Sequence, residues 1–61
     1  MTNREIYEMV THKTPSEDDV EFKNQCKELL KEATAIIATP GVSGGYIALA
    51  LFTIHNLHIE D

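Results

Sequence analysis

The stretch at residues 15–41 reads PSEDDVEFKNQCKELLKEATAIIATPG and carries the longest helical pattern in the chain. Its apolar residues recur at steps of three and four, the spacing that places side chains on one face of an α-helix. They are Phe22, Cys26, Leu29, Leu30, Ala33, Ile36 and Ile37. Ser16 is the expected N-cap, because a hydroxyl followed by acidic residues suits the start of a helix. Pro40 and Gly41 end the pattern. The sequence therefore predicts a long amphipathic helix from about Glu17 to Ala38.

A second, shorter helix is expected before this stretch, in TNREIYEMV at residues 2–10. Thr2 and Glu5 stand three apart, the arrangement of a capping box. Ile6, Met9 and Val10 follow at helical spacing. Pro15 disfavours helical geometry at the residue before it, so THKTP separates the two helices. Because two turns of helix are marginal in isolation, this segment must dock on another element.

The segment after the long helix, PGVSGGYIALALFTIHNLHI at residues 40–59, has almost no polar face. From Tyr46 to Ile54, eight of nine residues are apolar or aromatic. Alanine and leucine favour a helix from about Ser43–Gly45 to His58, while the β-branched and aromatic residues leave a strand as the alternative. Gly44 and Gly45 indicate either an ordinary turn or the close approach of another backbone or a ligand.

A helix that is apolar all round must be buried all round, and one partner helix covers only one face. A chain of 61 residues buries only about 60% of its unfolded surface, and its single cysteine allows no internal disulfide. We therefore expect an all-α fold, a short N-terminal helix plus a helical hairpin, that assembles into an oligomer. Residues 1–61 form one small domain in this prediction.

Charge and composition limit the partners. The formal net charge is −5, from ten acidic and five basic residues, which opposes general binding to DNA or RNA. The apolar run is shorter than the roughly 20 residues that span a bilayer, and the N-terminus has no apolar leader. With one cysteine besides, we expect a cytoplasmic protein without a membrane or nucleic-acid partner.

Three lysines, Lys23, Lys27 and Lys31, stand four residues apart and form a row on the long helix. The row borders the apolar stripe. One interpretation is a solvated edge whose lysine stems cover apolar surface. The other is a site that binds an anion, because three of the five basic residues gather there.

No metal or catalytic site is predicted. His55 and His58 are neighbours on a helix, but a metal ion would need further ligands, of which Cys26, Glu60 and Asp61 are the local suggestions, and no zinc-type spacing is present. We expect these histidines to be polar groups at an interface edge. Without a nucleophile motif or a phosphate-binding loop, we expect no enzyme activity and no cofactor. A thiol in an apolar stripe packs as a small hydrophobe.

The order of elements from about Met9 onward resembles that of the small phage proteins that sequester cyclic nucleotides, the anti-CBASS sponges and the related Thoeris inhibitors. His12 and Pro15 match the break before the long helix of that family. The residues that match its closing helix are Leu49, Ala50, Leu51 and Ile54. The chain differs from the family pattern at Thr11, at Gly44–Tyr46 and at Phe52–Thr53.

The resemblance implies a helical-hairpin homo-oligomer, typically a hexamer, that binds a cyclic di- or trinucleotide between subunits without cleaving it. Such a protein counters bacterial antiphage signalling. Lys27 matches a basic position of the family, flanked by Lys23 and Lys31. The residues expected to contact a base, or to let the protein backbone approach the ligand, are Tyr7, His12, Tyr46, Gly44 and Gly45. The alternative is a small regulator that binds another protein through its apolar third helix.

Overall fold

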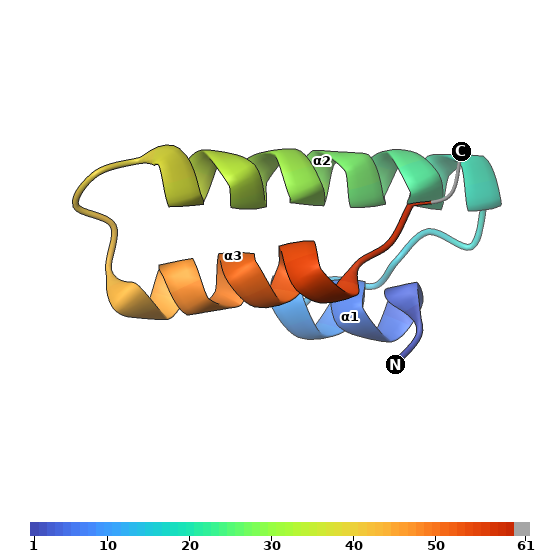
Figure 1. Ribbon diagram of the computed structural model, residues 1–61. Coiled ribbons are helices and arrows are strands. Elements are labelled where there is room, and N and C mark those ends of the chain that lie inside the picture. The colour runs from blue at the N-terminus through green and yellow to red at the C-terminus, as the bar shows by residue number, and fades with distance from the viewer. Residues whose placement is uncertain (60–61) are drawn as a thin grey trace.

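The computed structural model describes residues 1–59, which form three helices: α1 (Asn3–Thr11), α2 (Asp19–Ala38) and α3 (Gly44–Asn56). Helices α2 and α3 run antiparallel as a hairpin, and α1 packs against the part of that hairpin farthest from the α2–α3 turn (Figure 1). The predicted all-α fold, a short N-terminal helix plus a helical hairpin, is confirmed. The strand alternative for the third segment is wrong. Glu60 and Asp61 lie outside the described residues.

The N-terminus of α1 has the predicted capping box. The Glu5 N–H donates to Thr2 Oγ1 at 3.2 Å, and the Thr2 N–H donates to Glu5 Oε1 at 3.1 Å. The hydrogen bond from the Thr2 backbone favours the charged carboxylate and lowers the pKa of Glu5. At the other end, His12 takes a left-handed conformation with φ 57° and ends the helix.

The N-terminus of α2 lies two residues later than predicted, and the prediction that Ser16 caps it is wrong. Asp18 is the N-cap, and its carboxylate accepts from the Glu21 N–H at 2.9 Å. The Ser16 hydroxyl accepts from the Asp18 N–H at 3.2 Å, and the Ser16 N–H donates to Gln25 Oε1 at 2.9 Å. Serine therefore stabilises the turn before the helix, because Asp18 is an equally good cap and stands closer to the apolar stripe.

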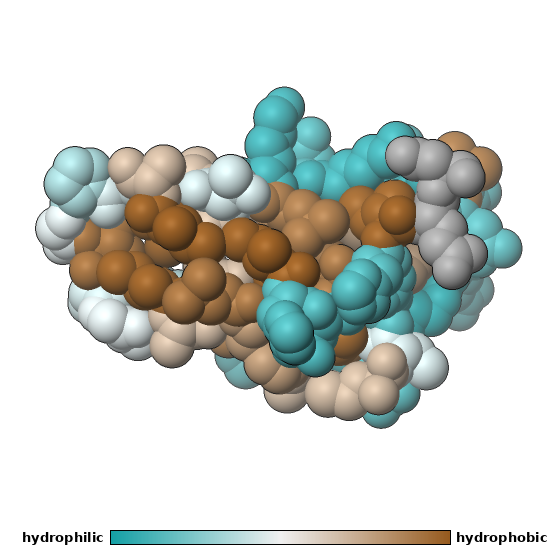
Figure 2. All heavy atoms as spheres, in the orientation of Figure 1, coloured by the Kyte–Doolittle hydropathy of each residue, from teal (hydrophilic) through white to brown (hydrophobic). Residues whose placement is uncertain are grey.

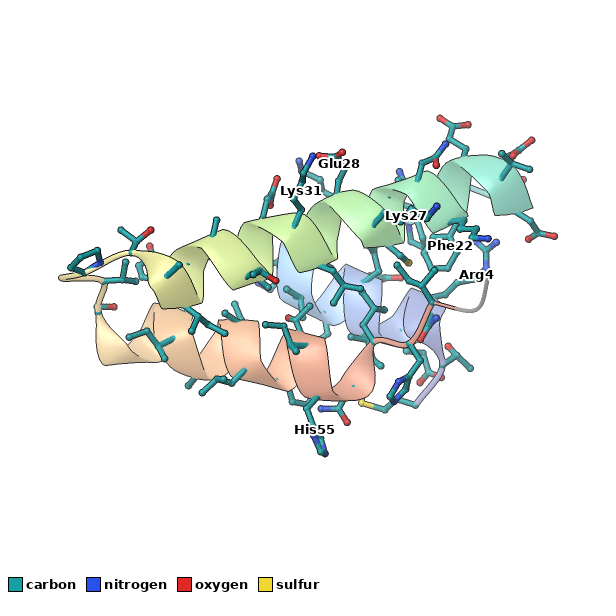
Figure 3. All side chains as sticks on the ribbon, turned by 45° about the horizontal axis from the view of Figure 1, so that its top comes forward. Arg4, Phe22, Lys27, Glu28, Lys31 and His55 are labelled. Carbon is teal, nitrogen blue, oxygen red and sulfur yellow. The ribbon has the colours of Figure 1, made fainter. Side chains whose placement is uncertain are left out.

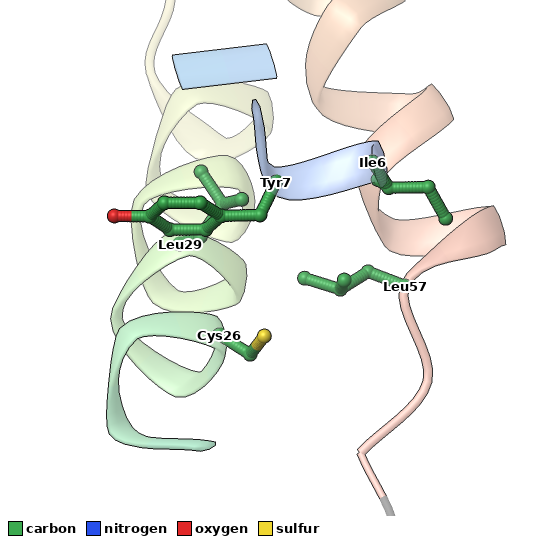
Figure 4. Close-up of a cluster of buried hydrophobic side chains, with 5 residues drawn as sticks. All are labelled: Ile6, Tyr7, Cys26, Leu29 and Leu57. Atoms are coloured by element: carbon green, nitrogen blue, oxygen red, sulfur yellow. The ribbon is translucent and has the colours of Figure 1, made fainter. Parts of the chain in front are cut away.

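The core lies where α1 crosses the hairpin. It consists of Ile6, Tyr7, Cys26, Leu29 and Leu57, contributed by all three helical regions (Figure 4). Ile6 is 1% exposed and Leu57 is 2% exposed. The Tyr7 ring meets the Phe22 ring edge to face, with centroids 5.9 Å apart. The short helix α1 thus supplies the centre of the core, as its marginal length required.

Arg4 joins α1 to the start of α2. Its guanidinium donates to the Ser16 carbonyl and to Asp19 Oδ1, the latter at 3.1 Å. The same group lies 4.4 Å from the centroid of the Phe22 ring (Figure 3). The guanidinium of Arg4 therefore holds α1 against the start of α2, and its hydrogen bonds and ring contact leave it little free to bind a ligand.

We expect Arg4→Ala to lower the free energy of unfolding by about 1–2 kcal/mol, because it removes one cation–π contact and one tertiary hydrogen bond. The exposed ion pair with Asp19 adds little. Arg4→Lys keeps the charge without the fork, so its stability should fall between those of Arg4→Ala and the wild type. Urea denaturation followed by circular dichroism measures both, and an unchanged Arg4→Ala midpoint would contradict the role given to this contact.

Candidate functional site

The outer face of α3 is apolar and uncovered by its own chain. The buried residues of α3 are Ala50 and Thr53, on the side that lines a hollow shared with α1 and α2. Four other large side chains are exposed: Tyr46 by 64%, Leu49 by 42%, Leu51 by 52% and Ile54 by 38%. Figure 2 shows hydrophobic surface over α3 and along its seam with α2. In the single chain these apolar side chains therefore meet solvent.

A hollow of about 300 Å³ opens between the end of α1 and the α2–α3 hairpin. It exists because α1 stops at Thr11, so the groove between the two longer helices continues uncovered toward the turn. Aliphatic side chains line it: Val10, Leu29, Ala33, Ile36, Leu49 and Ala50. Polar groups at the hollow come from Lys13, Glu32 and Tyr46, and from two threonines.

Two threonines also line this hollow but offer no hydrogen to a ligand. The Thr11 hydroxyl donates to the Tyr7 carbonyl at 2.7 Å, and the Thr53 hydroxyl donates to the Leu49 carbonyl at 2.8 Å. Within residues 1–59, neither the Lys13 ammonium nor the Glu32 carboxylate has a hydrogen bond or an ion pair. The charged groups at the hollow are thus available to another molecule.

The predicted lysine row divides between two surfaces. Lys27 and Lys31 share a shallow depression on α2 with Glu28 and Leu30, and Figure 3 shows Glu28 and Lys31 on the side of α2 away from α3. Lys23 is partly buried and lines a different, smaller hollow. Tyr46 lines the hollow beside α1 and Lys27 lines the depression on α2, and these two share no lining residue.

The other predicted ligand groups also lie apart. Tyr7 is a core residue whose ring packs edge to face on Phe22, and it also lines the hollow beside Gln25. His12 is exposed at the end of α1. Gly44 and Gly45 begin α3, and no backbone atom lies within 4 Å of a Cβ placed on either. In the single chain these glycines therefore serve the turn rather than a close approach.

The histidines are not gathered around a metal site. His58 lines a small hollow that Cys26 also lines, whereas His55 projects from the exposed side of α3 (Figure 3). Among residues 1–59, no three potential metal ligands come together. The His58 carbonyl accepts from Asn3 Nδ2 at 2.6 Å, which fastens the segment after α3 to the start of α1.

Cys26 lies within the core, and burial raises the pKa of its thiol. A protonated, buried thiol is a poor nucleophile. We expect Cys26→Ala to lower the free energy of unfolding by about 1 kcal/mol and to leave any binding activity intact. The raised pKa means that the folded state holds the thiol proton more tightly than the unfolded state does. The free energy of unfolding should therefore fall only as pH rises above about 9, where the thiol of the unfolded chain ionises.

Denaturation midpoints from neutral to alkaline pH measure this. The alkaline loss of stability should be smaller in Cys26→Ala than in the wild type. Loss of binding by a fully folded Cys26→Ala would contradict the structural role.

No known family model, curated protein or solved structure matches this chain. Within residues 1–59, each helix is too short or too polar to cross a lipid bilayer.

Proposed function

We propose that this chain is a non-enzymatic binding protein that sequesters a cyclic di- or trinucleotide second messenger in a homo-oligomer, countering bacterial antiphage signalling. The cytoplasm of the infected cell is its place of action in this proposal. The observation that carries it is the hollow beside the uncovered apolar face of α3, with Lys13 and Tyr46 among the residues that line it. Apolar walls with a few polar groups suit a flat base and its phosphate.

Self-association is part of the proposal because a second subunit would cover Leu51 and Ile54, which the chain leaves exposed. The resemblance to phage sponges, which bind between subunits, supports the same arrangement.

The absence of catalysis in this proposal rests on the reactive groups near the hollows. The Cys26 thiol is buried and its pKa is raised. The Thr11 and Thr53 hydroxyls are held by carbonyls of their own helices. Neither arrangement activates a nucleophile for attack on phosphorus.

The test is to incubate the protein with cyclic di- and trinucleotides, remove free ligand by dialysis, denature the protein and identify what is released. We expect an intact cyclic nucleotide in an amount comparable with the protein. Release of a linear product would show hydrolysis and contradict sequestration, and recovery of no nucleotide would contradict binding.

A second candidate is a module that binds another protein through α3. The separation of Lys27 and Lys31 from Tyr46 favours it, because these residues line two different hollows. An apolar helix face is a common docking surface for a partner helix. The nucleotide recovery experiment separates the two, since this candidate predicts no bound nucleotide.

A further inference from the structure

The hollow between α1 and the hairpin has a charge pattern that the sequence did not indicate. Lys13 and Glu32 line it and also line the neighbouring hollow beside Tyr7 and Gln25. They therefore stand where the two hollows meet. Within residues 1–59 neither charge has a partner. A ligand in this hollow can therefore contact the Lys13 ammonium and the Glu32 carboxylate at the edge of an aliphatic cavity.

The size and walls of the hollow limit the ligand. About 300 Å³ lies at the small end of the range for small-molecule sites, which suits one base with its sugar and phosphate rather than a whole cyclic dinucleotide. Aliphatic side chains such as Leu29, Ile36 and Leu49 can contact the faces of a flat ring. Tyr46 is 64% exposed at the same hollow and offers an aromatic face for stacking.

The charges of Glu32 and Lys13 restrict which base the hollow can hold. An ionised carboxylate only accepts hydrogen bonds, so Glu32 requires a ligand edge that donates. Guanine presents two adjacent N–H donors on one edge, which match the two oxygens of a carboxylate, whereas adenine presents one. The Lys13 ammonium is a donor without an acceptor and suits phosphate.

We propose that this hollow holds a guanine base and its adjoining phosphate, with Lys13, rather than Lys27, as the cation that contacts the phosphate. The inference rests on the proposed function and specifies its ligand as a guanine-containing cyclic dinucleotide. Tyr46 stacks on the base and Glu32 accepts from its N–H edge. The second nucleotide projects from the hollow toward a neighbouring subunit, so one chain binds half of the ligand.

Calorimetric titration with cyclic di-GMP and cyclic di-AMP tests this proposal on the full chain and four variants. Lys13→Ala should weaken cyclic di-GMP binding about tenfold to a hundredfold, the effect of losing a charge-assisted hydrogen bond. Lys27→Ala makes the same change in net charge and should bind within about twofold of the wild type. Tyr46→Ala should weaken both ligands, and Glu32→Gln should reduce the preference for cyclic di-GMP.

These variants change exposed residues, so circular dichroism should report a wild-type melting curve for each. If Lys27→Ala loses affinity while Lys13→Ala and Tyr46→Ala bind normally, the hollow is not the site, and the inference fails while the proposed function stands. If the wild type binds cyclic di-AMP but not cyclic di-GMP, the assignment of guanine fails alone. If the wild type binds neither these nor any other cyclic nucleotide, both proposals fail.

Discussion

Ile6→Ala is expected to leave most of the protein unfolded at ambient temperature. Ile6 is 1% exposed and contacts a core that joins all three helical regions. Removing a large aliphatic side chain from such a position costs about 2–5 kcal/mol. A single core in a chain of this size rarely supplies more than about 3–5 kcal/mol in total. The loss is therefore comparable with the whole stability of the fold.

Urea denaturation followed by far-ultraviolet circular dichroism measures this effect. The matched control is Val20→Ala, which shortens an aliphatic side chain that is 73% exposed on α2. Its midpoint should equal or exceed that of the wild type, because alanine is the better helix former. An Ile6→Ala midpoint equal to that of the wild type would mean that α1 does not hold the core together.

Leu51→Glu is expected to dissociate the oligomer while each chain keeps its helical fold. In the single chain Leu51 is 52% exposed, so a carboxylate there meets solvent. In an assembly that covers α3, the same carboxylate would be buried without a partner, which is strongly disfavoured. The exposure of Leu51 in the single chain therefore favours dissociation over unfolding.

Light scattering at micromolar concentration measures the assembly. The wild type should scatter as an oligomer and Leu51→Glu as a monomer with an unchanged circular dichroism spectrum. Leu51→Met conserves volume and apolar character, so it should remain assembled. A wild type that scatters as a folded monomer would contradict the self-association that the proposed function requires.

Sequence patterns predicted the helices well because their signals are local. The capping box at Thr2 and Glu5 lies within one turn, and the three- and four-residue spacing of α2 identified the face that Cys26 and Leu29 bury. The start of α2 was predicted two residues too early, because three acidic residues follow Ser16 and any of several side chains could cap the helix. Choosing among them needed the turn geometry, which depends on Gln25.

The site was predictable only in part, because it depends on where α1 lies. Lys13 lies in the loop between α1 and α2, and its place at the hollow follows from the point at which α1 ends over the hairpin. The contact of the Tyr7 ring with Phe22 likewise depends on how α1 lies over α2, which the spacing of α1 residues did not indicate. Arg4 carried no sequence signal beyond its charge. These three positions depend on tertiary contacts that spacing along the chain does not encode.

Thermal melting of the wild type against a panel of cyclic di- and trinucleotides tests the proposed function most directly. A ligand present at a hundred times its dissociation constant adds about 2.7 kcal/mol to the stability of the folded state. In a domain of this size that raises the melting temperature by about 10–20 °C. We predict such a rise with at least one member of the panel, largest for one containing guanine. A melting temperature that no cyclic nucleotide raises, at concentrations up to the millimolar range, would contradict nucleotide sequestration and favour a protein partner for α3.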